Sequence, residues 1–400
     1  MLVERARHVL ARLEEYVRSE NYAGWDPYDA LNSRLLRGLT ACHPLAQRVA
    51  IHLLKSSPWN VRALLGITKM HNPTALSLFT DTYINLYRIE GREEYLVRAH
   101  HLWHLLRRTS CIDTRHELAW GRNFPFVTAQ ETHELGKPLT FLNAKIGCTL
   151  LTLYRLSRTP DLMDCAERIA TATVRHGKVF HVQGLSFLGY SSSPRPRFIV
   201  NACMLAAQFF LHFLRSAGQQ DYTVDGTSVR TLAQDLLATV LRTQAPDGSW
   251  PYGYSFTLKR LGRIDFHQGF VLDSLLETAR LLDDPDTRRK ALLAYDRGLA
   301  FMTRVQITPH GAFCWKPSRT YPIDIHNQAQ GIISLSKAPH NCYDERLEAI
   351  LRFTLDNFWD EMRGYFYYQK HMVGLNRIPY MRWAQGWMAY ALSEYIRRYR

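Results

Sequence analysis

The sequence predicts an all-α protein, an (α/α)6 toroid in which six outer helices surround a ring of six inner helices, with long loops on one face. Three observations lead to this prediction. Strongly apolar helical segments recur about every 60 residues, amphipathic segments alternate with them, and the connections alternate between short and long. Such a repeat is typical of a chain that stacks one structural unit many times.

The inner helices are predicted from segments with little polar surface. The segment at 199–214 is apolar almost all round, as expected of a helix buried on every side. The six predicted segments begin near Thr74, Thr140, Ile199, Phe266, Ile325 and Met381.

The outer helices are predicted from apolar residues at helical spacing with charged residues between them. Five such segments are Tyr95–Leu106, Met163–Val174, Val229–Leu241, Arg289–Phe301 and Leu347–Phe358. The sixth is expected in the N-terminal region, at either Leu2–Tyr16 or Leu45–Leu54. Residues 1–400 are therefore predicted to form one domain, with residues 1–70 closing the ring.

The connections locate the functional face. Inner-to-outer turns are short and carry turn residues, as at Glu90-Gly91-Arg92 and Asp283-Asp284-Pro285-Asp286. Outer-to-inner connections are long, and long loops without repeats of their own are usually functional. They should all emerge beside the N-termini of the inner helices, where the helix dipoles favour anions and polarised oxygens.

Composition narrows the class of protein. No run of about 18 apolar residues indicates a membrane span, and no apolar signal-peptide core follows the N-terminus. Seven scattered cysteines without a CxxC pair favour a reduced, cytoplasmic protein. No dinucleotide, P-loop or zinc-site motif is present, so neither a cofactor nor a metal is expected.

The net charge of +14 is compatible with simple solubility, but it also favours an anionic partner such as an acidic polysaccharide. Nucleic acid is not expected, because the basic residues are dispersed. Peripheral contact with a membrane stays open.

A duplicated tetrad supplies the catalytic candidates. Ile-Asp-Phe-His opens the fourth inner helix with Asp265 and His267, and Ile-Asp-Ile-His opens the fifth with Asp324 and His326. Paired carboxylates or paired imidazoles can divide acid and base roles at one site. The alternative is that each Asp only caps its helix.

Substrate-binding candidates occur in equivalent positions of several repeats. Aromatic side chains offer flat faces to sugar rings, and Arg binds carboxylates in a bidentate manner; the alternative is that the aromatic residues pack loops and core. The candidates are Trp250, Tyr252, Gln328, Tyr380, Arg382, Trp383, Gln385, Glu131, His133, Arg197 and Asn201.

Four motifs resemble the VpsJ-type proteins of bacterial exopolysaccharide gene clusters. They are Gln244–Gly253, Arg263–Leu272, Tyr321–Gln330 and Ile378–Gln385. The likeness extends over nearly the whole chain, including Trp25–Asn32 and Asn60–Ile67. It implies a role in exopolysaccharide biosynthesis. The substrate would then be a polysaccharide or oligosaccharide, and acidic sugars are among the candidates.

More distantly, the arrangement is similar to the six-hairpin glycosidases, polysaccharide lyases and sugar epimerases. In that group, unsaturated glucuronyl hydrolases use two aspartates, which Asp265 and Asp324 could match. The N-acylglucosamine 2-epimerase-like enzymes use two histidines, which His267 and His326 could match.

The expected function is therefore a hydrolase, lyase or epimerase acting on a glycan. One alternative is a non-catalytic glycan-binding or assembly protein with the same cleft. A second is a terpene cyclase or prenyltransferase, because Gln244–Trp250 resembles the QW-type repeat of those toroids, although the acidic DxDD motif is missing.

Overall fold

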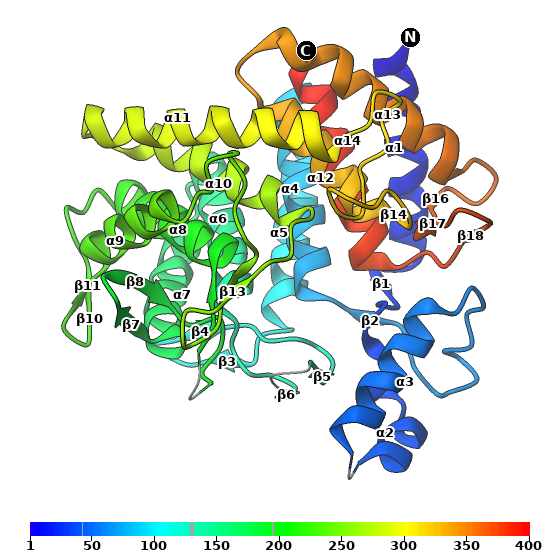
Figure 1. The fold of residues 1–400 in the computed structure, drawn as a ribbon, viewed down its shortest axis with the longest axis horizontal. Coiled ribbons are helices and arrows are strands. Elements are labelled where there is room, and N and C mark those ends of the chain that lie inside the picture. Colours follow the sequence, from blue (N-terminus) through cyan, green and yellow to red (C-terminus); the bar gives the residue numbers. More distant parts are fainter. Residues whose placement is uncertain (42, 129–131, 194–195) are drawn as a thin grey trace.

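The computed structural model describes residues 1–41, 43–128, 132–193 and 196–400. Six helices form the inner ring (Figure 1), and each packs against the next until α14 returns to α4. The ring helices are α4 (Pro73–Glu90), α6 (Thr140–Ser157), α8 (Val200–Ala217), α10 (His267–Leu281), α12 (Ile325–Lys337) and α14 (Trp387–Arg398). A π-helical turn, η4 (Met381–Gly386), leads into α14. The (α/α)6 toroid predicted from the sequence is confirmed.

Each inner helix has an outer helix packed against it. The outer helices are α5 (Glu93–Arg107), α7 (Pro160–Gly177), α9 (Val229–Arg242), α11 (Pro285–Phe301), α13 (Asp344–Phe358) and α1 (Leu2–Ser19). The first alternative for the sixth outer helix is thus the correct one, because α1 packs against α14. The second alternative falls in α3 (Pro44–Ser56), which packs with α2 (Arg34–Thr40) outside the ring.

Local chemistry sets the ends of the ring helices. At the start of α4, the side-chain oxygen of Asn72 accepts hydrogen bonds from the backbone N–H groups of Thr74 and Ala75, which satisfies two of the donors left unpaired in a first turn. The same helix ends at Gly91, whose φ of 69° is the left-handed conformation that favours glycine.

Short antiparallel strands and single turns of helix brace the connections. The two-stranded ribbons are β1 (Ala23–Gly24) with β2 (Met70–His71), β3 (Ile112–Asp113) with β4 (Leu118–Ala119), β5 (Phe126–Val127) with β6 (Thr132–His133), β7 (Val179–Val182) with β8 (Leu185–Leu188), β10 (Thr223–Val224) with β11 (Thr227–Ser228), and β15 (Trp359–Asp360) with β16 (Tyr365–Phe366). The three-stranded sheets are β9 (Phe198–Ile199), β12 (Gly253–Tyr254) and β13 (Arg260–Leu261), and β14 (Ile323–Asp324), β17 (Gln369–Lys370) and β18 (Leu375–Asn376). The remaining short turns are η1 (Asp29–Asn32), η2 (Met302–Gln306) and η3 (Asn341–Tyr343).

A buried amide near the start of four inner helices holds the preceding loop in place. In each case the side-chain oxygen accepts a hydrogen bond from a backbone N–H of that loop, at 2.5 to 3.0 Å. The pairs are Asn143 with Trp120, Gln268 with Trp250, Gln328 with Phe313, and Gln385 with Phe366. Because a buried N–H without a partner is costly, this repeated contact fixes the long loops over the N-terminal ends of the ring.

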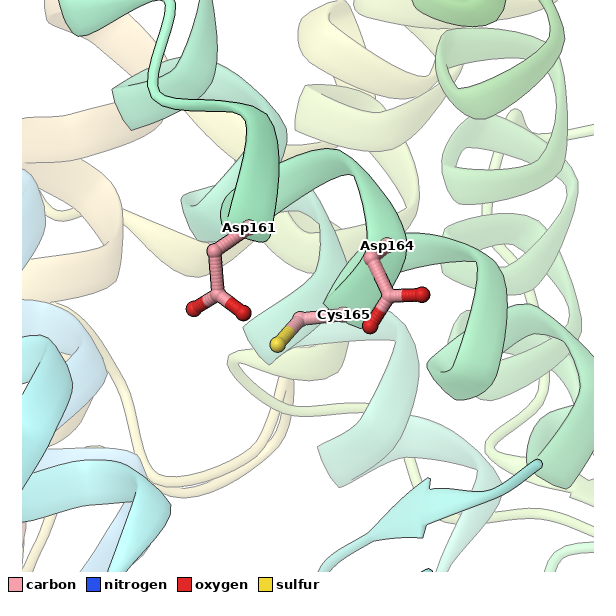
Figure 2. Close-up of side chains that lie close together, drawn as sticks. All are labelled: Asp161, Asp164 and Cys165. Atoms are coloured by element: carbon pink, nitrogen blue, oxygen red, sulfur yellow. The ribbon is translucent and has the colours of Figure 1, made fainter. Parts of the chain in front are cut away.

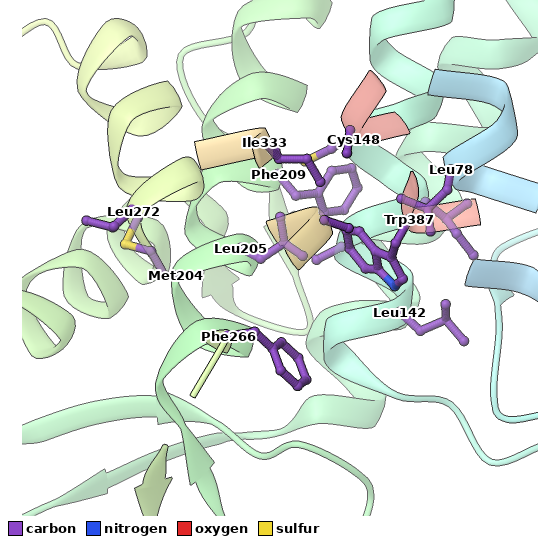
Figure 3. Packing of buried hydrophobic residues seen from close by; sticks show 14 of the residues in the cluster. Leu78, Leu142, Cys148, Met204, Leu205, Phe209, Phe266, Leu272, Ile333 and Trp387 are labelled. Atoms are coloured by element: carbon purple, nitrogen blue, oxygen red, sulfur yellow. The ribbon is translucent and has the colours of Figure 1, made fainter. Parts of the chain in front are cut away.

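The core extends between neighbouring inner helices and between the inner and outer helices. Figure 3 shows the part in which side chains from α4, α6, α8, α10, α12 and α14 lie close together. The helix α8 is buried on nearly every side, as its composition predicts. Close approach of α6 to α8 depends on Gly147. A Cβ atom at that position would lie 2.2 Å from the ring of Phe209.

Replacing Gly147 by Ala is therefore expected to lower the free energy of unfolding by about 1–3 kcal/mol, since overpacking forces backbone shifts in a close-packed core. Urea denaturation followed by circular dichroism measures the change. The matched control is Gly38→Ala, because nothing lies within 4 Å of a Cβ built on Gly38 in α2. An unchanged midpoint for Gly147→Ala would show that the two helices separate without cost.

Candidate functional site

A cavity of about 180 Å³ opens among the N-terminal ends of the inner helices, on the face that the long connections cover. Its wall draws on the first turns of α4, α6, α8, α10 and α12 and on η4. The polar residues of the wall are Tyr28, Asn72, Thr74, Arg122, Tyr190, Asn201, Tyr252, Arg263, His267, His326 and Arg382. Within the described part of the chain, the lining holds three arginines and two histidines but no Asp or Glu.

His267 reaches this cavity as the first residue of α10. Its backbone N–H donates to Oδ1 of Asp265 at 3.1 Å, and its Nδ1 lies 2.5 Å from the same oxygen. Burial disfavours the charged carboxylate, but His267 and the Arg263 guanidinium outweigh it and hold the pKa of Asp265 well below its usual value. An ionised carboxylate only accepts, so Nδ1 carries the proton and Nε2 is left as a base.

His326 lies in the wall of the same cavity, in the first turn of α12. The side chain is buried, and neither ring nitrogen has a hydrogen-bond partner among the described residues. Burial, with the charge of Arg382, holds the pKa of His326 well below its ordinary value, so the ring is neutral at pH 7. Because buried polar groups are almost always satisfied, these nitrogens are suited to receive a ligand.

Aromatic rings set the positions of the two imidazoles. Phe266 stacks on His267 with ring centroids 4.2 Å apart and on His326 with centroids 4.1 Å apart. Two rings cannot share one face of Phe266 at that spacing, so the histidines lie on opposite faces of it. Trp387 stacks on the far side of His326 at 4.6 Å.

The two aspartates of the tetrads do not line the cavity. Their carboxylates form hydrogen bonds with other groups of the protein. Asp324 is fully buried and caps α12 by accepting the N–H of His326 at 2.9 Å. Its other contacts are with Trp383 Nε1 at 2.8 Å and Gln369 Nε2 at 2.6 Å. Burial raises the pKa of Asp324. Asp324 therefore caps α12, whereas Asp265 accepts the first backbone N–H of α10 and also orients His267, which lines the cavity.

Arg382 lines the cavity, but its guanidinium already binds a carboxylate of the protein, that of Asp26, through two hydrogen bonds. Nε and Nη2 donate to the two oxygens of Asp26 at 2.6 and 2.8 Å, and both side chains are nearly buried. A substrate carboxylate would have to compete with Asp26 for this guanidinium. The pair ties the N-terminal segment to the last inner repeat.

The remaining predicted residues divide into two groups. Tyr252, Trp383 and Asn201 line the cavity, and Asn201 has a buried side-chain oxygen without a partner among the described residues. Arg197 is outside the lining. Burial raises the pKa of Tyr252 to about 12, and the positive charge of Arg197 opposes part of that rise.

The second group is buried away from the cavity. Trp250 is packed beneath its loop and donates from Nε1 to the Val240 carbonyl at 2.9 Å. The ring of Tyr380 lies under the Arg62 guanidinium, and Gln328 and Gln385 hold loops as described above. These positions fill space because their side chains point into the protein. Glu131 lies outside the described residues, and for His133 only the backbone is described, in β6.

Several lining residues have no counterpart in the sequence prediction. Arg122 donates to the Tyr190 hydroxyl at 3.2 Å, and its guanidinium lies 5.0 Å from the centre of the Phe126 ring. Tyr28 packs edge-on against Trp383. These residues lie in irregular loops, where the sequence has no periodic pattern that would show which way a side chain points. The only signal available was their location in loops that precede inner helices.

A second cavity of about 280 Å³ lies at the opposite end of the ring. Phe141, Phe270 and Trp387 line both cavities and so form the partition between them. The second cavity contains ion pairs between inner helices, such as Lys145 with Asp81 and Lys337 with Asp273. The charges of these two lysines are offset by their acidic partners, and the lining as a whole holds more basic than acidic side chains.

Among the described residues, one group has three metal-ligating side chains within reach of each other: Asp161, Asp164 and Cys165, at the start of the outer helix α7 (Figure 2). Both carboxylates already face arginines, Asp161 at 3.7 Å from Arg107 and Asp164 at 3.7 Å from Arg168. Burial raises the pKa of the Cys165 thiol to about 11, which disfavours the thiolate that binds metals. The group does not resemble a metal centre.

The fold and the cavity define an (α/α)6 toroid with an imidazole-lined pocket at the N-terminal ends of its inner helices. Neither a protein-family model nor a curated protein matches the chain in sequence. Solved structures match it in fold. A cellobiose 2-epimerase from Bacillus thermoamylovorans aligns with a TM-score of 0.61 and 12% identity, over 82% of this chain and 88% of its own.

Two hydrolase-type structures align equally well. A GH76 α-mannanase from Bacteroides thetaiotaomicron has a TM-score of 0.62 and 9% identity, over 83% of this chain and 88% of its own. A possible GH105 member from Salmonella enterica has a TM-score of 0.60 and 13% identity, over 82% and 84%. At such identities the likeness shows the fold alone. The chain has the six-hairpin glycosidase-like toroid fold.

Proposed function

We propose that the protein is a sugar epimerase or isomerase of bacterial exopolysaccharide biosynthesis, acting in the cytoplasm on a reducing mono- or oligosaccharide. The observation that carries this proposal is the pair of neutral histidines in the cavity wall, separated by Phe266. The aspartates that a two-carboxylate hydrolase would need are turned into the protein and used as caps.

The chemistry follows from this arrangement. In the open-chain sugar, one imidazole takes the proton from the carbon next to the carbonyl, and the electron pair forms an enediolate. To invert that carbon, the other imidazole takes up a proton from solvent and gives it to the opposite face, while the first imidazole releases its proton to solvent. To move the carbonyl, the first imidazole gives its proton to the neighbouring carbon, while the hydroxyl proton of the enediolate passes to the adjacent oxygen. Either route conserves all atoms and needs no redox partner.

The charge of the cavity suits the intermediate. Arg122 and the N-termini of the inner helices contribute positive potential to the cavity in which an enediolate would form, and Arg263 and Arg382 also line it but are paired with Asp265 and Asp26. Aromatic side chains give flat surfaces for the sugar ring. The same positive lining would also accept an acidic sugar. The resemblance to VpsJ-type proteins supports an exopolysaccharide precursor as the source of the substrate.

A proton NMR time course in D2O tests this proposal, with cellobiose, D-mannose and the reducing repeat unit of the host polysaccharide as substrates. We expect solvent deuterium to appear at a ring carbon next to the anomeric carbon, without chain cleavage. New reducing ends would instead establish hydrolysis and contradict the histidine mechanism. Ligand signals that broaden without any chemical change would establish a glycan-binding protein and contradict catalysis.

A further inference from the structure

The helices α2 and α3, with the loop that follows α3, present an apolar surface to solvent. They project from the body of the molecule (Figure 1). Seven large apolar side chains in this segment are between 49% and 88% exposed. They are Leu35, Leu39, Leu45, Val49, Leu53, Trp59 and Leu64, and they are called the α2–α3 patch below. A cluster of exposed apolar residues on a folded protein commonly marks a docking site.

The patch has the geometry of a helix face. In α3, Leu45, Val49 and Leu53 are four residues apart and so form one stripe. The buried residues Ile51 and Leu54 lie on the opposite side of the helix, against a small separate core. In α2, Leu35 and Leu39 share a face in the same way, and no described residue of α2 is buried.

The charge around the patch has one sign. No Asp or Glu occurs between Asp29 and Asp81, although this segment is fifty-one residues long on the printed sequence. The segment carries six basic residues, namely Arg34, Arg37, Arg48, Lys55, Arg62 and Lys69. Arg62 and Lys69 are paired with Asp29 and Glu20, whereas Arg34, Arg37 and Arg48 have no ion-pair partner among the described residues.

The basic residues also lie beside the apolar stripe. Arg48 and His52 follow one another along a single side of α3, next to the face of Leu45 and Leu53, whereas Lys55 turns inward and donates from Nζ to the Tyr28 hydroxyl at 2.9 Å. An apolar face flanked by Arg and Lys is the pattern of a helix that lies in the surface of a bilayer. The long basic stems can then reach the headgroup level while the apolar side chains enter the hydrocarbon boundary.

We propose that the α2–α3 patch docks the protein on an anionic lipid bilayer. A second copy of the chain fits less well, because a two-fold interface through this patch would bring Arg34, Arg37 and Arg48 of one copy close to the same basic segment of the other. An acidic polysaccharide could match the charge but offers no hydrocarbon for the leucines. The proposal does not depend on the proposed activity. None of the helices among the described residues could cross a membrane, so the contact is peripheral.

Flotation of the full-length protein with vesicles tests the proposal, using phosphatidylcholine vesicles with and without about 30 mol% phosphatidylglycerol. We expect binding to the anionic vesicles and little to the neutral ones. Changing Arg34 and Arg37 to Gln should weaken binding about fivefold per arginine. Changing Leu45 and Leu53 to Ser should weaken it about tenfold or more.

Matched controls come from α11, outside the patch, where Leu293 is 54% exposed and the exposed Arg289 lies 3.7 Å from Asp286. The variants Leu293→Ser and Arg289→Gln should bind vesicles like the wild type. Light scattering in the absence of lipid should show the same mass for the wild type and the patch variants. Absence of flotation, equal binding to neutral vesicles, or a dimer that Leu45→Ser dissociates would each overturn the proposal.

Discussion

Changing His326 to Gln is expected to reduce kcat for sugar epimerisation or isomerisation by about 10²–10⁴-fold, the range that general acid–base catalysis supplies. The imidazole is buried in the cavity wall with both nitrogens unpartnered among the described residues, so its removal takes away a reacting group. Gln fills a similar volume, so the stack between Phe266 and Trp387 should stay closed. The measurement is the rate of deuterium incorporation in D2O under saturating sugar.

The control variant is His181→Gln, because His181 is an exposed histidine of β7 whose Nδ1 pairs with the Ser186 hydroxyl at 2.9 Å. Its rate should equal that of the wild type. Asp265→Asn should have an intermediate effect, since the amide can no longer hold His267 as a carboxylate does. A fully active His326→Gln variant would remove the two-histidine mechanism.

The pH profile gives an independent check on the same residues. Burial lowers the pKa of both His267 and His326 relative to the ordinary value of 6.5. A base acts in its unprotonated form, so lowering its pKa keeps it active at lower pH. The rate should therefore stay constant as the pH falls through 6.5 and should decrease only below it. A decrease centred at or above pH 6.5 would indicate a different base.

Changing Arg382 to Met is expected to lower the free energy of unfolding by about 3–5 kcal/mol, the cost of leaving one member of a buried ion pair without its partner. Asp26 would lose both of its hydrogen bonds to the guanidinium and would have few alternatives, because it is 5% exposed. Chemical denaturation of the purified variant measures the loss.

The double variant with Asp26→Asn should recover part of this stability, because it removes the buried charge together with its partner. The matched control is Arg289→Met, since Arg289 is exposed and lies 3.7 Å from Asp286; surface pairs of this kind contribute little. If Arg382→Met keeps full stability and loses only affinity for acidic sugars, the guanidinium serves the ligand and not Asp26.

The sequence by itself determined the elements that depend on neighbouring residues. The starts of the inner helices follow from the apolar repeat. Five lie within one residue of their predicted positions, and at the sixth, Met381, the π-helical turn η4 begins and leads into α14 at Trp387. The tetrads are also local. An Asp placed two residues before a first-turn His can cap the helix through the N–H of that His, and both copies do so.

Only the tertiary structure decided which polar side chains meet in the cavity. The Arg382–Asp26 pair joins residues separated by 356 positions, and nothing in either motif indicates the other. Gln328, Gln385 and Trp250 looked like binding residues because they stand near the functional face, yet their side chains turn inward to satisfy buried backbone groups. Periodicity indicates which side of a helix is apolar, but not the direction of a side chain in a loop.

The choice between α1 and α3 as the sixth outer helix shows the same limit. Both segments are amphipathic, so either could cover α14 on sequence evidence alone. Which one does is decided by the fit of the apolar face of α1 against α14. The stripe of α3 is exposed to solvent, since α3 packs against α2 and not against the ring. No local sequence pattern distinguishes these two outcomes, because long-range packing decides between them.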